Sequence, residues 1–109
     1  MKSNFSSIIS KTNSVAMGDD FADLILTNCS LVNVYSKEIQ EKIQIAITND
    51  RIAFVGPDAS HTIGPKTKIL DVKNKFVSPS FVDPHIHIDH FITPLEFVKK
   101  SLLCGVTSL

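Results

Sequence analysis

The sequence has few cysteines, no excess of either charge and no long apolar run, and each of these absences excludes a class of protein. Cys29 and Cys104 lie far apart and form neither a Cys-x-x-Cys motif nor a zinc-knuckle spacing. Because both have apolar neighbours, we predict buried free thiols in a reducing compartment, the cytoplasm. Eleven basic residues balance eleven acidic ones, which argues against nucleic-acid or anionic membrane partners. No apolar run approaches the roughly 20 residues that a membrane-spanning helix needs.

Arginine and acidic residues are absent from the first eighteen positions, which contain two lysines and five serines. A transit peptide shares the lack of acids but is rich in arginine. Phe5, Ile8 and Ile9 have the i, i+3, i+4 spacing of an amphipathic helix. Residues 1–21 are therefore predicted to be an N-terminal extension or a short helix that packs on the domain.

Residues 22–77 consist of short apolar runs separated by turn residues, which predicts an antiparallel β-unit of about five strands. The runs DLILTN and SLVNVY, with NCS between them, predict a first hairpin. The run KIQIAIT alternates so that Ile43, Ile45 and Ile47 share one face of a strand. The Asn49-Asp50 pair that follows is typical of a tight hairpin turn. Such a unit needs a second sheet or a neighbouring domain to cover its apolar face.

Residues 78–109 predict a strand, a helix and a second strand. The run FVDPHIHID is strand-like, and a helix follows in which Thr93 is the N-cap and Glu96 completes a capping box. Gly105 marks the end of that helix, and VTSL begins the next strand. Strand, helix and strand in this order open a parallel α/β unit, which cannot complete a barrel or a doubly wound sheet alone. We therefore expect the sequence to be the N-terminal part of a longer protein.

The segment DPHIHIDH holds three of the four histidines of the chain together with two aspartates. On a strand, Asp83, His85, His87 and Asp89 would project to one face, and His90 to the other. Two imidazoles placed in this way can bind one zinc, iron, manganese or nickel ion. Asp83 or Asp89 would then orient a ligating imidazole through its second ring nitrogen. An ordinary strand with polar residues remains open, because catalytic zinc needs at least three protein ligands.

The context of this motif resembles a known family. The run VSPSFVDPHIHID is similar to the first-strand signature of the amidohydrolase superfamily, Pro-Gly-Phe-Ile-Asp-x-His-x-His, although Ser80 replaces the glycine. Within that superfamily the adenine deaminase family is indicated by GDDFADLILTN, LVNVYSKEI, HIHID and ITPLEFVKKSLLCGVTSL. The resemblance implies an α/β fold: a β-sandwich segment at 22–77, then the first βα(β) unit of an incomplete TIM (β/α)8 barrel at 78–109.

By the same resemblance His85 and His87 would bind a pair of divalent metals, manganese or iron, with zinc as the alternative. Later strands of such enzymes supply the remaining ligands. A metal-activated hydroxide would attack C6 of adenine, releasing ammonia and hypoxanthine. Asp89 stands where the family has glutamate. A homo-oligomer is left open, and the 109-residue chain alone is predicted to be inactive.

Two other interpretations stay open at this point. The chain could belong to another cyclic amidohydrolase, of the hydantoinase or dihydroorotase kind, because those enzymes share the His-x-His motif. Alternatively, it could be an inactive truncated remnant that acts only as an interaction module. His61 lies alone in a polar loop and is predicted to be an ordinary surface histidine.

Overall fold

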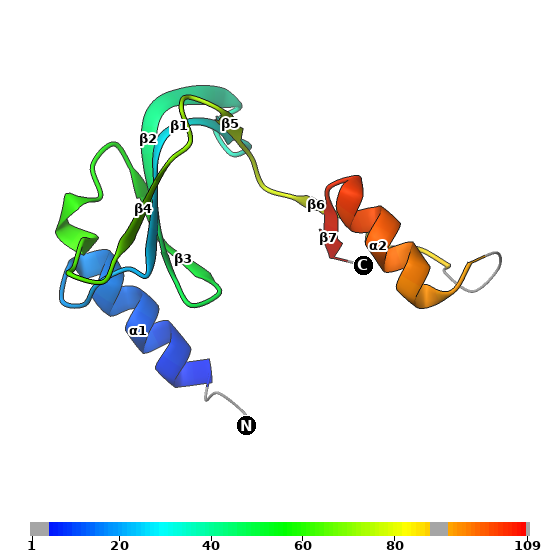
Figure 1. Cartoon of the computed structure of the whole chain (residues 1–109), viewed down its shortest axis with the longest axis horizontal. Helices are drawn as coiled ribbons and strands as arrows, with labels where there is room; N and C mark the ends of the chain where they lie inside the picture. Colours follow the sequence, from blue (N-terminus) through cyan, green and yellow to red (C-terminus); the bar gives the residue numbers. More distant parts are fainter. Residues whose placement is uncertain (1–4, 88–91, 109) are drawn as a thin grey trace. The chain divides into compact units, whose positions relative to one another are not determined.

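The computed structural model describes residues 5–87 and 92–108 (Figure 1). The chain divides into two compact units, Met1–Ser78 and Pro79–Leu109. The first unit contains α1 (Phe5–Met17), β1 (Leu24–Asn33), β2 (Glu38–Thr48), β3 (Arg51–Gly56), the 3-10 helix η1 (Ser60–Thr62), β4 (Lys68–Asp71) and β5 (Phe76–Val77). The second contains β6 (Phe81–Val82), α2 (Pro94–Leu103) and β7 (Val106–Ser108). None of the helices in the described ranges is long and apolar enough to cross a membrane.

The first unit is built on one mixed sheet, in which β3, β2, β1 and β4 lie in that order and β5 also pairs with β1. The β1–β2 and β2–β3 pairs are antiparallel, but β4 and β5 run parallel to β1. The prediction of an antiparallel unit is therefore wrong for the last two strands. After β3 the chain returns through η1 to the opposite edge of the sheet, so β4 enters beside β1 in the same direction (Figure 1).

β1 also differs from the prediction, because its ten residues form one strand where a hairpin at NCS was expected. The register with β2 shifts between Leu26 and Cys29, and Asn28 between them has a φ of 55°. Asparagine is one of the few residues that adopt this left-handed conformation readily. The residues that suggested a turn therefore form an irregularity of the β-bulge kind within a continuous strand.

α1 packs on β2 and β3 through a residue that the sequence pattern did not single out. Val15 is fully buried and belongs to an apolar cluster with Ile25 and Ala46, which are paired neighbours on β1 and β2. Phe5 and Ile9, expected to make the contact, are 70% and 44% exposed. The predicted helix exists, but the turn that fixes it to the sheet lies near its C-terminal end.

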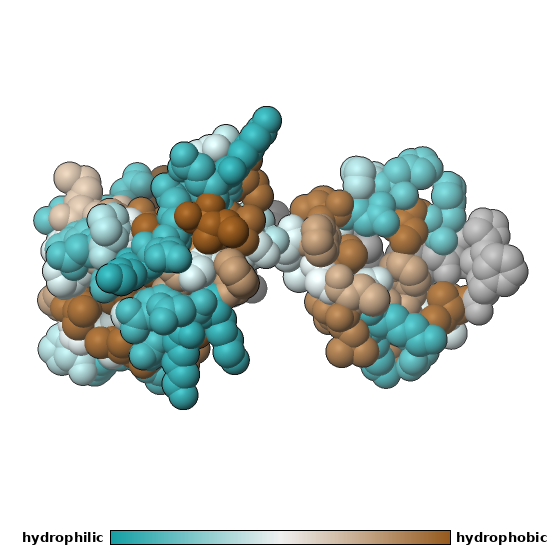
Figure 2. Space-filling view, turned by 90° about the horizontal axis from the view of Figure 1, so that it is seen from above, coloured by the Kyte–Doolittle hydropathy of each residue, from teal (hydrophilic) through white to brown (hydrophobic). Residues whose placement is uncertain are grey.

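The second apolar cluster contains Ile43 and Ile45, both buried, with Ile47 partly buried beside them. The predicted common face of these three isoleucines is confirmed. The strand register extends this face to Val55 on β3 and Leu70 on β4, which are 45% and 52% exposed. Figure 2 shows apolar side chains at the surface of each unit.

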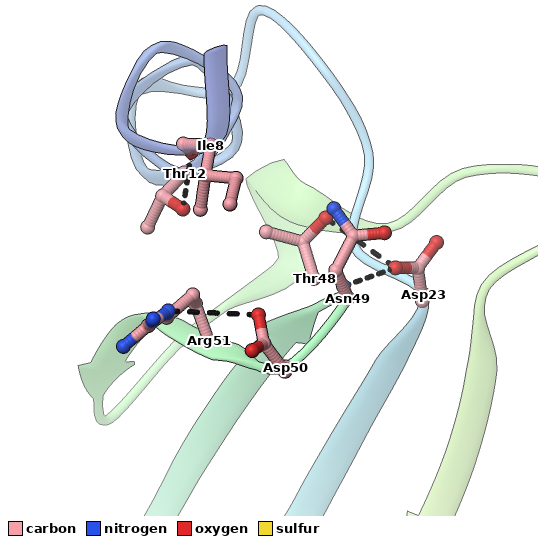
Figure 3. A network of polar contacts seen from close by, with 7 residues as sticks. All are labelled: Ile8, Thr12, Asp23, Thr48, Asn49, Asp50 and Arg51. Carbon is pink, nitrogen blue, oxygen red and sulfur yellow. Dashed lines mark hydrogen bonds and ion pairs between the residues drawn. The ribbon is translucent and has the colours of Figure 1, made fainter. Parts of the chain in front are cut away.

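The turn between β2 and β3 is the predicted two-residue hairpin, closed by the pairing of Thr48 with Arg51. Asn49 takes a positive φ of 52°. Its backbone N–H donates to Asp23 Oδ2 at 2.6 Å, and the Thr48 hydroxyl lies 3.4 Å from the same oxygen (Figure 3). One carboxylate therefore ties this turn to the start of β1.

In the second unit β6 and β7 pair in parallel, with α2 between them in sequence. The predicted boundaries of α2 are confirmed: Thr93 Oγ1 accepts from the Glu96 N–H at 3.4 Å, and Pro94 is the first helical residue. Gly105 follows the C-cap with a φ of 84°, and its carbonyl accepts from the Phe81 N–H at 2.9 Å. The end of the helix is thus joined directly to β6.

The two cysteines have different environments. Cys29 is buried in the second apolar cluster, as predicted, and desolvation raises the pKa of its thiol. Cys104 is exposed, so the prediction of burial is wrong for this residue. The apolar stripe of α2, represented by Leu95 and Leu102, is exposed as well, at 66% and 56%. A side chain with apolar neighbours in the sequence is buried only when another element packs over it.

Candidate functional site

The candidate site begins where β6 ends, and it does not have the predicted strand geometry. β6 covers only Phe81–Val82, and the chain bends at Pro84 and His85. Proline has no N–H to donate to a ladder, which accounts for the early end of the strand. Asp83, His85 and His87 therefore lie beyond the strand, and strand alternation does not place them on one face.

The two imidazoles nevertheless lie close together. The ring centroids of His85 and His87 are 5.1 Å apart, with the ring planes at 73°, and both residues are exposed. Two imidazoles that bind one tetrahedral metal at ~2.0–2.1 Å from nitrogen have ring centroids about 5 Å apart. The spacing of these rings therefore fits two corners of a metal site.

The carboxylate of Asp83 contacts the backbone of the histidine pair. Its Oδ1 accepts a hydrogen bond from the backbone N–H of His85 at 3.2 Å. Asp89, the other predicted orienting residue, and His90 lie outside the described residues. Asp83 therefore shapes the chain between β6 and the histidine pair.

A complete ligand set is not found in the part of the chain that the structure describes. Within residues 5–87 and 92–108, no three side chains among His, Cys, Asp and Glu come together to hold a metal ion. Two imidazoles are suitable donors for zinc, iron or manganese, but they leave the coordination incomplete. His85 and His87 thus fit as part of a metal site.

Two further polar residues link β6 to β7. The Ser80 hydroxyl contacts the Thr107 hydroxyl across the pair of strands. Ser80 stands where the resembled signature has glycine, so its side chain has found a partner on the neighbouring strand. Sequence reasoning identified Ser80 as a departure but missed Thr107, because only the parallel pairing of β6 with β7 brings the two together.

His61 is exposed, as predicted, but it is not isolated. Its Nε2 lies 3.0 Å from the carbonyl oxygen of Ala16 in the last turn of α1, and its ring packs edge-on against Phe54 at 4.7 Å. A cationic or donor side chain at a helix C-terminus satisfies a free carbonyl there. His61 therefore holds α1 on the sheet through contacts within the first unit.

Comparison with known proteins identifies relatives over nearly the whole chain. An adenine deaminase of Cenarchaeum symbiosum is 54% identical over 101 residues, which are 93% of this chain and 17% of that protein. Adenine deaminase 3 of Rhizobium meliloti is 42% identical over 106 residues, 96% of this chain and 18% of that protein. An adenine deaminase of Clostridium botulinum is 44% identical over 96 residues, 87% and 16% of the two chains. No family model matches.

The predicted resemblance to adenine deaminases is confirmed by these similarities. The chain spans about a sixth of the length of the curated relatives it matches, between 16% and 18% for the three named above. Among solved structures, a Bacillus thuringiensis protein is 33% identical with a TM-score of 0.47. That match covers 66% of this chain and 97% of the other.

Proposed function

We propose that this chain is the first segment of a metal-dependent adenine deaminase, and that it contributes the first two metal ligands of that enzyme. The observation that carries the proposal is the pair of imidazoles 5.1 Å apart directly after β6. The similarity to proteins named adenine deaminase covers the same part of the sequence. The complete protein is therefore expected to be a hydrolase that converts adenine and water to hypoxanthine and ammonia.

His85 and His87 would hold the metal through their ring nitrogens. A bound divalent ion would supply Lewis acidity and lower the pKa of a water molecule to near neutrality. Manganese or iron is proposed first and zinc as the alternative, all of which accept imidazole nitrogen. The chain itself supplies two imidazole donors, and both residues are exposed to solvent. Further ligands and the proton-transferring acid would come from later strands.

The position of the pair favours a (β/α)8 barrel as the complete architecture. β6, α2 and β7 form a strand–helix–parallel strand unit, and the histidines follow the C-terminal end of its first strand. In such barrels the active site lies at the C-terminal ends of the strands. The exposed apolar stripe of α2 would be covered by neighbouring barrel elements. Likewise, the exposed part of the sheet in the first unit would face the rest of a β-sandwich.

The substrate alternative is a cyclic amide, because hydantoinases and dihydroorotases share the His-x-His motif. To decide, the full product of the gene is assayed for ammonia release from adenine and for ring opening of hydantoin and dihydroorotate. The proposal expects ammonia release alone. Ring opening without ammonia release would show that the substrate is a cyclic amide and not adenine.

A chimera tests the contribution of this chain directly. The chain replaces the matched 101 residues of the Cenarchaeum symbiosum enzyme, and metal content and adenine deamination are measured. We expect His87→Ala to remove metal and activity together, while His61→Ala retains the metal. Equal metal loss in both variants would contradict the assignment of the ligands. The isolated 109-residue chain is expected to show no deamination.

A further inference from the structure

The turn that leads into the histidine pair is fixed at both ends. The backbone N–H of Asp83 donates to the Ser108 carbonyl on β7 at 2.9 Å, which anchors the residue to the end of the parallel strand pair. Its side-chain Oδ1 then accepts from the N–H of His85, two residues further on. This arrangement is an Asx-turn, in which a side chain takes the place of a backbone acceptor.

Pro84 gives this turn its stiffness. Its ring holds φ close to −65°, and it has no N–H of its own to satisfy. The next donor in the chain, the N–H of His85, lies beyond the paired residues of β6 and donates to the Asp83 carboxylate. The short side chain of aspartate or asparagine places its oxygen where it can accept from the N–H two residues further on. The carboxylate and the proline ring therefore restrict the backbone that sets the direction of the His85 side chain.

We propose that Asp83 is a positioning residue for the two proposed metal ligands, His85 and His87, and that it acts through the backbone of His85 and not through an imidazole ring. The inference rests on the proposed function, because it assumes that His85 and His87 bind a metal. It differs from the usual arrangement, in which a carboxylate accepts the second ring N–H of a ligating histidine. The required property of Asp83 is a short side-chain oxygen acceptor, and its negative charge is secondary.

This distinction can be tested with three substitutions at one position. Asp83→Asn keeps an oxygen acceptor at the same distance from the backbone but removes the charge. Asp83→Glu keeps the charge but lengthens the side chain, and Asp83→Ala removes the acceptor. If the turn is what matters, asparagine replaces aspartate better than glutamate does. If charge near the imidazoles is what matters, glutamate is the better replacement.

The measurement is a zinc titration of the 109-residue chain and the three variants, followed by NMR of the histidine ring protons and of the His85 amide. We expect Asp83→Ala to weaken zinc binding by about tenfold, the lower end of the range for residues that orient metal ligands. Asp83→Asn should stay within about twofold of the parent chain. Without metal, the His85 amide signal should move in Asp83→Ala and stay near its original position in Asp83→Asn.

The outcomes separate the two proposals. If the parent chain binds zinc and Asp83→Asn loses as much zinc affinity as Asp83→Ala, the positioning role of Asp83 is overturned. His85 and His87 then remain the proposed metal ligands. An unchanged affinity in Asp83→Ala has the same meaning. If the parent chain shows no zinc-dependent change at His85 or His87, metal binding by these two residues is refuted, and the positioning role of Asp83 is refuted with it. Signals from the first unit serve as the folding control in each variant.

Discussion

Replacing Val15 by alanine tests whether α1 is an integral part of the first unit. Val15 is fully buried, and it is the buried residue of the helix. Two methyl groups are lost, which costs about 1.6 kcal/mol at about 0.8 kcal/mol per buried carbon. The cavity left behind adds to this cost, while the better helix propensity of alanine returns up to about 0.7 kcal/mol. We expect a net destabilisation of about 1–2 kcal/mol.

Urea unfolding followed by far-ultraviolet circular dichroism is the appropriate assay, because the chain has no tryptophan and a single tyrosine. With a typical slope for a small domain, Val15→Ala should lower the urea midpoint by about 1 M. Met17→Ala is the matched control in the same helix, since Met17 is 77% exposed and should change stability by less than about 0.5 kcal/mol. Equal midpoints for the two variants would show that the helix does not dock through Val15.

Three further predictions concern single residues. Cys104 should react with a thiol reagent at neutral pH in the folded chain, whereas Cys29, buried and with a raised pKa, should react only on unfolding; equal rates would contradict this. The pKa of Asp71 is lowered by the hydrogen bond from Asn28, so its contribution to stability is present above about pH 4 and is lost on further acidification. A pH scan of stability should therefore be flatter for Asp71→Ala. Gly105→Ala should destabilise α2 by about 1 kcal/mol, because Gly105 has a φ of 84°; an unchanged helix signal would refute it.

Local features of the fold could be predicted from the sequence, because neighbouring residues determine them. Thr93 and Gly105 bound α2 through cap geometry, and Asn49 turns the β2–β3 hairpin with a positive φ. The alternation of Ile43 and Ile45 placed both on a buried face. The caps and the turn depend on contacts within a few residues of the position concerned, and the alternation of the isoleucines is itself a local pattern.

Features that depend on distant contacts could not be predicted in the same way. The parallel pairing of β4 with β1 joins residues more than forty positions apart, such as Leu26 and Leu70, and no local pattern specifies it. The burial of Val15 depends on which turn of α1 meets the sheet. At the candidate site, β6 ends before Pro84, next to Asp83. The polar–apolar alternation continues past this point in the sequence, so the alternation alone predicted a longer strand.

The most direct test of the central claim is a manganese titration of the chain, followed by NMR of the ring protons of His85, His87 and His61. A metal held by the first two broadens their signals together at low manganese concentration and leaves His61 sharp, and His87→Ala removes the effect at His85. Broadening of the His61 signals at the same concentration, or a His85 response unaffected by His87→Ala, would contradict metal binding by His85 and His87 together.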